Sequence, residues 1–307
     1  MACKGQDNAV PLGGYYQGLS ASRDRGRIMV PDWKTNLVYF SRLLARRYPA
    51  LCGRVRRVIQ DHGVQVRFLE GTADVWIRDY APIQITKKRF VKFHYIPDYL
   101  RGCKHLITKD EICGQLQELG EINHSDLVVD GGNIVVARTR VILTEKVFWE
   151  NPKWKRTQVR KHFQETFHNR TCIIVPTEPL DPIGHSDGLV RFLDDDRVVV
   201  NDYSRVDPRY GRKLERALAK HGLEITSLPY RPDKKSRRRI PPATGNYVNF
   251  LRVGNLVIVP AHGLPEDDEA VQVLQRILPK ATVVPLDCRE LAREGGCWNC
   301  ASWTVKV

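Results

Sequence analysis

A repeated pattern of paired apolar segments constrains the fold of this chain more than any other feature. In each pair, two short apolar runs flank a three-residue turn, which is the pattern of a β-hairpin. The turns occupy residues 87–89, 138–140, 194–196 and 253–255. They recur at intervals of roughly 55 residues, a spacing typical of repeat architectures. The chain is therefore expected to fold as a series of similar units.

Helical patterns separate the hairpins, over residues 109–119, 154–167, 209–221 and 266–278. A short apolar strand follows each of the later helices, at 172–175, 223–226 and 282–284. The unit is thus strand, loop, hairpin and helix, and such units arranged around an axis form a propeller-like ring. No interdomain linker is apparent, so residues 1–307 are expected to form one domain, with residues 1–24, rich in Gly and Ser, as a flexible arm.

The composition is that of an ordinary globular protein, with 42% hydrophobic and 27% charged residues. No apolar run reaches the length of a transmembrane helix, and no apolar stretch follows the N-terminus as in a secretory signal. The cysteines are scattered rather than grouped into a disulfide framework, so reduced thiols and a cytoplasmic location are expected. Cys52, Cys113 and Cys172 lie among apolar neighbours and are interpreted as inert core residues.

The net charge of +14 is concentrated most strongly at residues 231–239, within a loop expected over 231–243. Such a cluster can contact phosphates or acidic surfaces. No RNA-binding aromatic signature, zinc finger or helix-turn-helix pattern accompanies it. A solvated loop is therefore favoured over a nucleic-acid site, and no membrane partner is expected.

Residues capable of chemistry collect in the loops between each lone strand and the hairpin that follows it. Loops that connect equivalent strands of a ring emerge on one face, where a repeat scaffold places a site. The five segments are Asp74–Pro82, Val129–Asn133, Gly184–Gly188, Gly245–Asn249 and Glu294–Cys300. Each segment alone is weak evidence, because an Asp before glycines usually marks a turn and a lone His is usually structural.

A metal or redox role for the Cys297-x-x-Cys300 pair is not favoured. Structural zinc needs four ligands, and no second pair at similar spacing is present, although Cys288 and His262 could be recruited. A thioredoxin-type pair would lie early in a βαβ unit rather than next to the C-terminus. We therefore expect neither a metal nor a cofactor.

Taken together, the five loops resemble the agmatine deiminase and Porphyromonas-type peptidylarginine deiminase family of the guanidino-group-modifying superfamily. The resemblance runs from about Pro31 to the C-terminus. Its motifs are Trp-x-Arg-Asp-x-x-Pro at 76–82, Asp-Gly-Gly-Asn at 130–133, Gly-His-x-Asp at 184–187, Tyr-x-Asn at 247–249 and a terminal Gly-Gly-x-x-x-Cys. It implies the α/β fold of a five-bladed, pseudo-symmetric propeller of the pentein type built from ββαβ repeats, in agreement with the repeat described above.

The resemblance also implies a role for each of five side chains. A guanidinium is a flat, delocalised cation and a poor electrophile, and two carboxylates can hold its N–H groups. Asp79 and Asp187 match the family positions for that task, and Cys300 matches the nucleophile that attacks the central carbon to form a thiouronium intermediate. His185 matches the acid that protonates departing ammonia and the base that then activates water, and Asp130 would orient His185.

Several neighbouring residues remain open to two interpretations. Trp76 either stacks on the guanidinium or fills the core, and Asn249 either bounds the pocket or caps a strand turn. Arg78 is interpreted as a brace for its loop through ion pairing. Two departures from the family pattern bear on substrate identity: the family more often has Glu at the position of Asp130, and agmatine deiminases commonly have His at the position of Asn299.

The resemblance implies a hydrolase of linear amidines, a guanidino deiminase. Agmatine, which would give N-carbamoylputrescine and ammonia, is the first choice of substrate, and a protein or peptidyl arginine, which would give citrulline, is the alternative. An amidinotransferase would use the same thiouronium intermediate with an amine as acceptor. A third interpretation is a binding protein that retains the scaffold. The complete set of carboxylates, His and Cys argues against it. Assembly into a homo-oligomer is left open.

Overall fold

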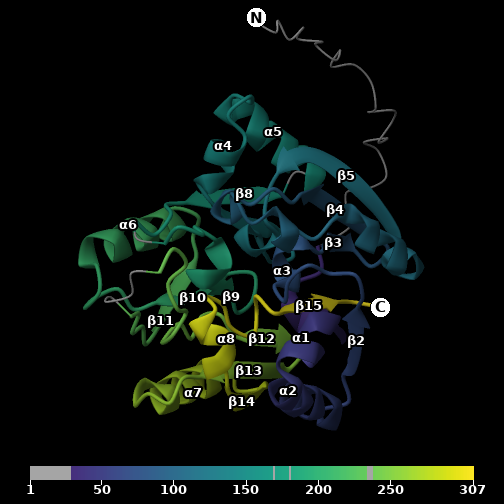
Figure 1. Ribbon diagram of the computed structural model, residues 1–307. Coiled ribbons are helices and arrows are strands. Elements are labelled where there is room, and N and C mark those ends of the chain that lie inside the picture. Colours follow the sequence, from purple (N-terminus) through teal and green to yellow (C-terminus); the bar gives the residue numbers. More distant parts are fainter. Residues whose placement is uncertain (1–28, 169, 180, 234–237) are drawn as a thin grey trace, which may run out of the picture.

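The computed structural model describes residues 29–168, 170–179, 181–233 and 238–307. The expected arm, residues 1–24, and the middle of the basic loop, residues 234–237, lie outside the described residues. Within the described ranges the strands form five sheets of three strands each. Figure 1 shows these sheets at the centre of the molecule, with α2, α5, α6 and α7 around them.

The same strand order repeats in all five sheets, each of which has an inner, a middle and an outer strand. The first sheet contains β15 (Ser302–Val305), β1 (Leu37–Ser41) and β2 (Gln65–Leu69), and the second contains β3 (Ile83–Thr86), β4 (Arg89–His94) and β5 (Glu121–Val128). The third contains β6 (Val135–Val136), β7 (Arg140–Thr144) and β8 (Thr171–Val175), and the fourth contains β9 (Val190–Phe192), β10 (Arg197–Asn201) and β11 (Glu224–Leu228). The fifth contains β12 (Leu251–Val253), β13 (Leu256–Ala261) and β14 (Thr282–Asp287).

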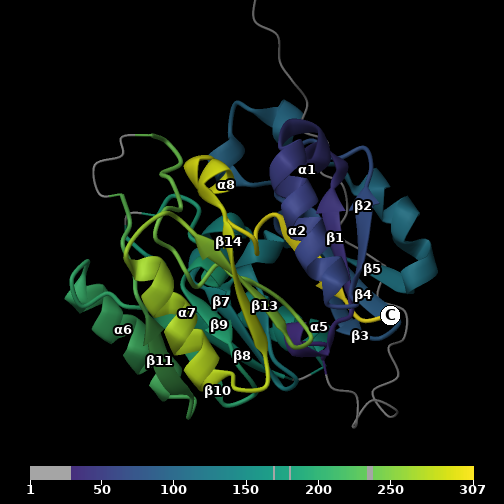
Figure 2. The same cartoon turned by 90° about the horizontal axis from the view of Figure 1, so that it is seen from below.

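Each middle strand pairs antiparallel with the inner strand and parallel with the outer strand. Parallel pairing requires a crossover connection, which a helix supplies in every sheet. The crossovers are α1 (Arg42–Arg47) with α2 (Pro49–Asp61), η4 (Asp110–Leu119), α4 (Lys146–Glu150) with α5 (Arg156–Thr166), α6 (Pro208–Ala219) and α7 (Glu266–Ile277). Figure 2 shows α2, α6 and α7 packed outside the strands. The arrangement is the five-bladed α/β propeller that the repeat and the family resemblance predicted.

The core consists of five apolar clusters, each between two adjacent sheets. The strand β10 illustrates how the sequence produces this arrangement. Val198 and Val200 pack toward the third sheet, whereas Val199 packs toward the fifth. Because side chains of a strand alternate between its two faces, a continuous apolar run is needed where both faces are buried. The Val-Val-Val sequence meets that need.

The ring closes through the two ends of the described chain. β15 pairs antiparallel with β1, from Leu37 opposite Val305 to Phe40 opposite Ser302. The first sheet was not predicted from the sequence. Its inner and middle strands come from opposite ends of the chain, so no hairpin turn marks them as a pair.

The predicted elements are present with shifted boundaries. β4 begins at Arg89, inside the predicted turn, and the short helix α4 was not predicted. The segment expected as a helix over 109–119 forms a 3-10 helix from Asp110 to Leu119, and Gly114 at its centre has a low α-helix propensity. Across the residues described, no helix is long and apolar enough to span a bilayer.

Candidate active site

The loops that run from each outer strand to the next inner strand meet at one end of the ring. Hydrogen bonds link them to one another: Gly132 to Asp79, His185 to Asp130, Asn299 to Asp187, and Asn249 to Cys300. All five segments selected from the sequence therefore contribute to one constellation. Ring closure is what brings the C-terminal segment beside the first of these loops, where Arg78 N donates to Cys300 O at 3.1 Å.

The carboxylate of Asp79 lies in a short helix, α3 (Ile77–Tyr80), that the loop after β2 forms. Its Oδ1 accepts from the backbone N of Gly132 at 3.2 Å, and its Oδ2 accepts from the hydroxyl of Tyr99 at 3.2 Å. Burial raises the pKa of Asp79 to about 7. A cation bound at this carboxylate would stabilise its ionised form.

The second carboxylate, Asp187, lies in the 3-10 turn Ser186–Gly188 that precedes β9. Its Oδ2 accepts from Asn299 Nδ2 at 2.6 Å and lies 3.8 Å from the Sγ of Cys300. Asn299, the residue that departs from the family pattern, thus orients one of the two predicted guanidinium ligands. Its backbone O accepts from Arg78 Nε at 3.5 Å, so Arg78 contacts this loop through a hydrogen bond.

His185 lies between two buried carboxylates. Its Nε2 lies 2.9 Å from Asp130 Oδ2, and its Nδ1 lies 3.5 Å from Asp79 Oδ1. Burial lowers the pKa of His185, but the charge of Asp79 and the hydrogen bond that His185 donates to Asp130 outweigh it and raise this pKa to about 9. The raised pKa favours the protonated imidazolium, the form that a general acid would require.

Gly132 makes the close approach of these groups possible. A Cβ at this position would lie 2.5 Å from Asp79 Oδ1 and 2.6 Å from His185 Nδ1, closer than real contacts allow. The preceding Gly131 is equally confined, since its Cβ would lie 2.2 Å from the backbone O of Arg78. The two glycines of the Asp-Gly-Gly-Asn segment are thus required by close packing between loops.

Asn249 holds the loop that carries the predicted nucleophile. Its Oδ1 accepts from the backbone N of Cys297 at 3.2 Å and of Cys300 at 3.3 Å, while its Nδ2 donates to Cys300 Sγ at 3.1 Å. These contacts join Asn249 to the Cys300 loop, and its place at the edge of a substrate pocket stays a prediction. Burial, together with Asp187 and Asp79, raises the pKa of the Cys300 thiol well above its ordinary value. Binding of a cation between those carboxylates would reverse part of that shift.

The other cysteine of the pair, Cys297, faces the core. Cys297 is fully buried in the apolar cluster between the fifth and first sheets, with Cys288 nearby, and its Sγ donates to Ala243 O at 3.7 Å. Burial raises the pKa of the Cys297 thiol as well. Over the part of the chain that is described, no cluster of three or more potential ligands could hold a metal ion.

Trp76 packs against the segment that precedes the cysteines. A Cβ on Gly296 would lie 2.5 Å from the Trp76 ring, so the ring rests on this glycine. Its other contacts are with the apolar cluster between the fifth and first sheets, in which it is partly buried. The core-filling interpretation accounts for these contacts, and stacking on a guanidinium stays a prediction.

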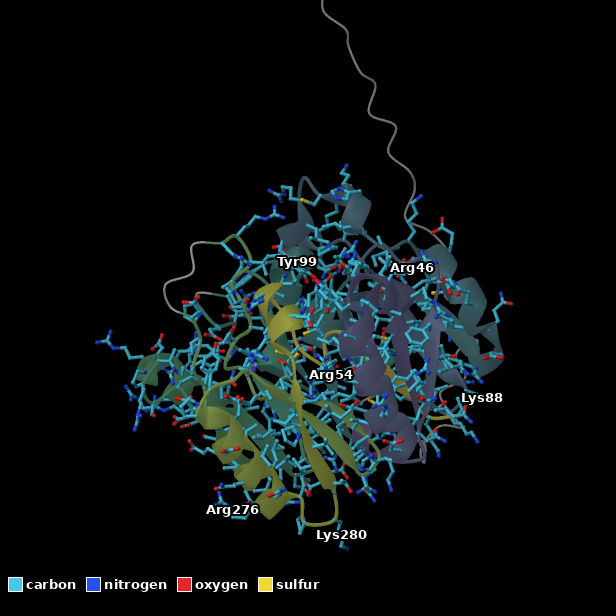
Figure 3. The ribbon with its side chains drawn as sticks, turned by 60° about the horizontal axis from the view of Figure 1, so that its bottom comes forward. Arg46, Arg54, Lys88, Tyr99, Arg276 and Lys280 are labelled. Carbon is cyan, nitrogen blue, oxygen red and sulfur yellow. The ribbon has the colours of Figure 1, made fainter. Side chains whose placement is uncertain are left out.

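Two residues that the sequence did not single out complete the site. Tyr99, in the 3-10 turn Asp98–Leu100, donates to Asp79 and packs its ring edge-on against His185, with 5.8 Å between ring centroids. Lys146, the first residue of α4, places Nζ 3.8 Å from Asp130 Oδ2. In Figure 3, Tyr99 lies inward of the peripheral Lys88, Arg276 and Lys280. Neither residue belongs to the five segments, which is why pattern alone missed them.

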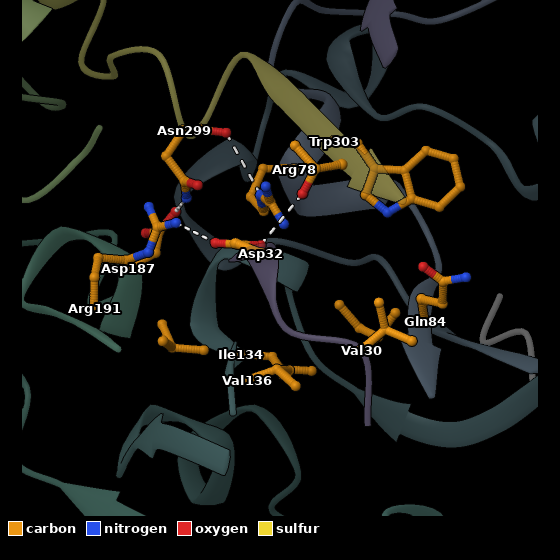
Figure 4. A pocket seen from close by; sticks show the side chains of 13 residues that line it. Val30, Asp32, Arg78, Gln84, Ile134, Val136, Asp187, Arg191, Asn299 and Trp303 are labelled. Carbon is orange, nitrogen blue, oxygen red and sulfur yellow. Dashed lines mark hydrogen bonds and ion pairs between the residues drawn. The ribbon is translucent and has the colours of Figure 1, made fainter. Parts of the chain in front are cut away.

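A small cavity of about 40 Å³ lies beside Asp187, among the inner strands. Figure 4 shows Arg78 and Asn299 on one side and Asp32 paired with Arg191 beneath them. Apolar side chains complete the lining, namely Val30, Ile83, Ile134, Val135, Val136 and Trp303. The segment around Asp32 thus packs beneath Asp187 and Asn299, and Thr304 Oγ1 donates to Asp32 Oδ1 at 3.2 Å.

Comparison with known proteins places this constellation in a family. The profile of the Porphyromonas-type peptidyl-arginine deiminases matches residues 42–305. The chain belongs to this family. Agmatine deiminase of Stutzerimonas stutzeri is 27% identical over 228 residues, which cover 62% of this chain and 61% of that protein. The chain thus matches about three fifths of the length of this relative.

Solved structures share the propeller fold with this member of the deiminase family. Agmatine deiminase of C. jejuni superposes with a TM-score of 0.77 at 18% identity, over 94% of this chain and 99% of that one. An amidinotransferase of Microseira wollei superposes with a TM-score of 0.63 at 12% identity, over 91% and 97% of the two chains. At these identities the likeness establishes the fold, which hosts more than one reaction.

Proposed function

We propose that this protein is a guanidino deiminase that hydrolyses agmatine to N-carbamoylputrescine and ammonia. One observation carries the proposal: the buried carboxylates Asp79 and Asp187 lie around the Cys300 thiol, and His185 lies between Asp79 and Asp130. The agmatine deiminases among its relatives support this choice of substrate.

The charges of the site favour a cationic ligand. Among the residues that the structure describes, His185 is the buried cationic group paired with Asp79, and it is shared with Asp130. A guanidinium seated against Asp79 and Asp187 would supply the missing positive charge and donate N–H groups to both. The same cation would lower the pKa of the Cys300 thiol, so substrate binding would itself favour the thiolate.

The reaction then follows from the geometry. Cys300 Sγ forms a bond to the central guanidinium carbon, and the electron pair of one C=N bond moves to nitrogen. The C–N bond to one terminal nitrogen breaks as His185 gives that nitrogen a proton, and ammonia leaves. A water molecule next adds to the thiouronium carbon while His185 accepts its proton. The C–S bond then breaks as the C=O bond forms, the remaining hydroxyl proton passes to solvent, and the ureido product and the thiolate are released.

The direct test is a colorimetric measurement of ureido product with agmatine, free arginine and an arginine peptide in parallel, each with and without a metal chelator. We expect agmatine to be turned over fastest and the chelator to change nothing, because the substrate is already cationic and His185 supplies the proton. Loss of activity on chelation, together with stoichiometric zinc, would contradict the proposal. Product formed only when an amine acceptor is added would indicate an amidinotransferase instead.

A second candidate substrate, a protein or peptidyl arginine, is favoured by the basic residues beside the site. Arg239 donates from Nη1 to the backbone O of Arg101 at 3.1 Å, two residues beyond Tyr99 in the chain. Arg238 donates from Nη1 to the backbone O of Arg293 at 2.8 Å, in the segment that leads to the cysteines. These arginines join two loops that carry site residues, and a basic rim suits an acidic group near the guanidinium.

Neutralising this rim distinguishes the two substrates. In the double variant Arg238→Gln/Arg239→Gln, kcat/KM for agmatine should stay unchanged or rise slightly, because a repelled dication approaches more easily. For an arginine peptide with acidic neighbours, kcat/KM should fall by about tenfold if the rim recognises those neighbours. The control is Arg276→Gln/Lys280→Gln, which removes the same charge at the periphery. An equal loss of kcat on every substrate, with the fold intact, would show that the loop organises the site itself.

A further inference from the structure

Lys146 is buried beside the catalytic groups, although the reaction described above makes no use of it. It is the first residue of α4 and is 3% exposed. Moving an ammonium group out of water costs several kcal/mol unless charges and hydrogen bonds compensate it, roughly in the range known for buried ions. The residues that surround Nζ therefore indicate what this side chain is for.

Four partners surround the Lys146 ammonium. Nζ donates to the backbone O of Ile183 at 2.7 Å and lies 2.9 Å from Asp98 Oδ1. It also lies 3.4 Å from Glu150 Oε1 and 3.8 Å from Asp130 Oδ2. Ile183 is two residues before His185, and Asp130 is the carboxylate that bonds His185. The ammonium thus contacts both the segment that carries the imidazole and the group that orients it.

The Lys146 ammonium is also linked to Asp79, through Tyr99. Nζ lies 4.9 Å from the centroid of the Tyr99 ring, a cation–π contact. The hydroxyl of that ring donates to Asp79 Oδ2 at 3.2 Å, and its edge faces His185. Asp98, the residue before Tyr99, is paired with Lys146, so this turn is held to α4 at two points. Lys146 therefore connects the loops that supply Asp79, Asp130 and His185.

We propose that Lys146 is a positioning residue, which holds Asp130 and the Tyr99 turn so that the two carboxylates on either side of His185 keep their places. It touches neither the substrate nor the reacting atoms. The proposal rests on the proposed function only in so far as His185 transfers the protons. Misplacement of a catalytic group by about 1 Å can cost roughly a hundredfold in rate, so loss of this anchor is expected to reduce kcat.

The charge of Lys146 also acts on the imidazole. The groups that face His185 are Asp79, Asp130, Asp181, Glu150, Tyr99 and Lys146. Asp79 and Asp130 raise the pKa of His185, whereas Lys146 lowers it. Without the ammonium, the imidazolium meets less repulsion, so the pKa of His185 should move above its value of about 9. The basic limb of the pH–rate profile should move in the same direction, provided that protonated His185 is the acid.

The test compares Lys146→Met with Lys146→Arg and with Asp98→Asn. The Asp98→Asn change removes the shortest ion pair of Lys146 Nζ, and it is the milder substitution because the Asp98 side chain is 54% exposed. Lys153→Met is the matched control, an exposed lysine just beyond α4. We expect kcat of Lys146→Met to fall by about 10- to 100-fold with KM changed less than about twofold. Lys146→Arg should retain more activity, Asp98→Asn should show a smaller loss than Lys146→Met, and Lys153→Met should equal the parent.

A titration that needs no substrate separates this proposal from the proposed function. Nitrogen NMR of the imidazoles, with His185 assigned through His185→Gln, should show an upward shift of the His185 pKa in Lys146→Met. An unchanged kcat and an unchanged His185 pKa would overturn the proposal. So would a loss of activity that matches a loss of folded protein while the pKa stays in place. If Lys146→Met does not fold, the kcat of Asp98→Asn provides the test, and a kcat equal to that of the parent would overturn the proposal. If the parent turns over no guanidine at all, the proposed function fails while the titration still tests Lys146.

Discussion

Cys300→Ala is expected to abolish turnover, by about four orders of magnitude or more, because no other thiol within the described ranges forms a hydrogen bond with a carboxylate of the site. Among the described residues, Cys300 is the cysteine whose Sγ contacts both Asp187 and Asn249. The measurement is kcat with agmatine, supported by mass spectrometry of a trapped thiouronium adduct in the parent enzyme. The variant should fold normally, since Asn249 retains its bond to the backbone N of residue 300.

Cys297→Ala is the matched control, three residues earlier in the same loop. Its side chain lies in the core, so the change should cost about 1 kcal/mol of stability and leave most of the activity. A Cys297→Ala enzyme that is folded yet inactive would show that the nucleophile has been assigned to the wrong cysteine. Both variants should be compared below the lower of their two unfolding temperatures.

Asp187→Asn should cause the second-largest loss, a fall in kcat/KM of about a hundredfold to a thousandfold. Losing one partner of a buried charge pair costs about 2–5 kcal/mol, and the guanidinium would keep only Asp79. In addition, the amide that Asp187→Asn introduces would place a second N–H donor near Asn299 Nδ2, which donates to Asp187 Oδ2 at 2.6 Å in the parent. The measurement is steady-state kinetics together with calorimetric binding of agmatine to Cys300→Ala, with and without Asp187→Asn.

Asp196→Asn is a suitable control for Asp187→Asn, because it removes a carboxylate that is 76% exposed and lies at a hairpin turn. Its kinetics and binding should match the parent. If Asp187→Asn bound agmatine as tightly as the parent, the guanidinium would have to be held elsewhere, and the proposed chemistry would lose its main support. A weaker binding with unchanged kcat would assign Asp187 to substrate capture alone.

Local sequence patterns predicted most of the fold. Alternation and turn residues marked the antiparallel strand pair in four of the five sheets, because these four pairs are hairpins, whose hydrogen bonds join residues close in sequence. The first sheet escaped prediction for the converse reason. Its inner strand β15 and its middle strand β1 are separated by nearly the whole chain, and only closure of the ring brings Phe40 opposite Ser302.

The candidate site also combines features that local sequence predicted with features that depend on tertiary structure. The sequence by itself singled out the candidate residues Asp79, Asp130, His185, Asp187 and Cys300, because they stand in the loops of a repeat and match motifs of the family. Their catalytic roles stay predictions. The sequence also determined that glycines separate Asp130 from the next strand. The structure supplied the reason, because a side chain on Gly132 would collide with Asp79 and His185.

Only the tertiary structure decided how those residues are held. Lys146 begins a crossover helix, and Tyr99 stands in an irregular connection after β4, so neither has a local pattern that signals a role. Their contacts with Asp130 and Asp79 join segments from different sheets. Local patterns report hydrogen bonding and burial along one segment, whereas the charge and position of a buried group depend on all the segments that the closed ring brings around it.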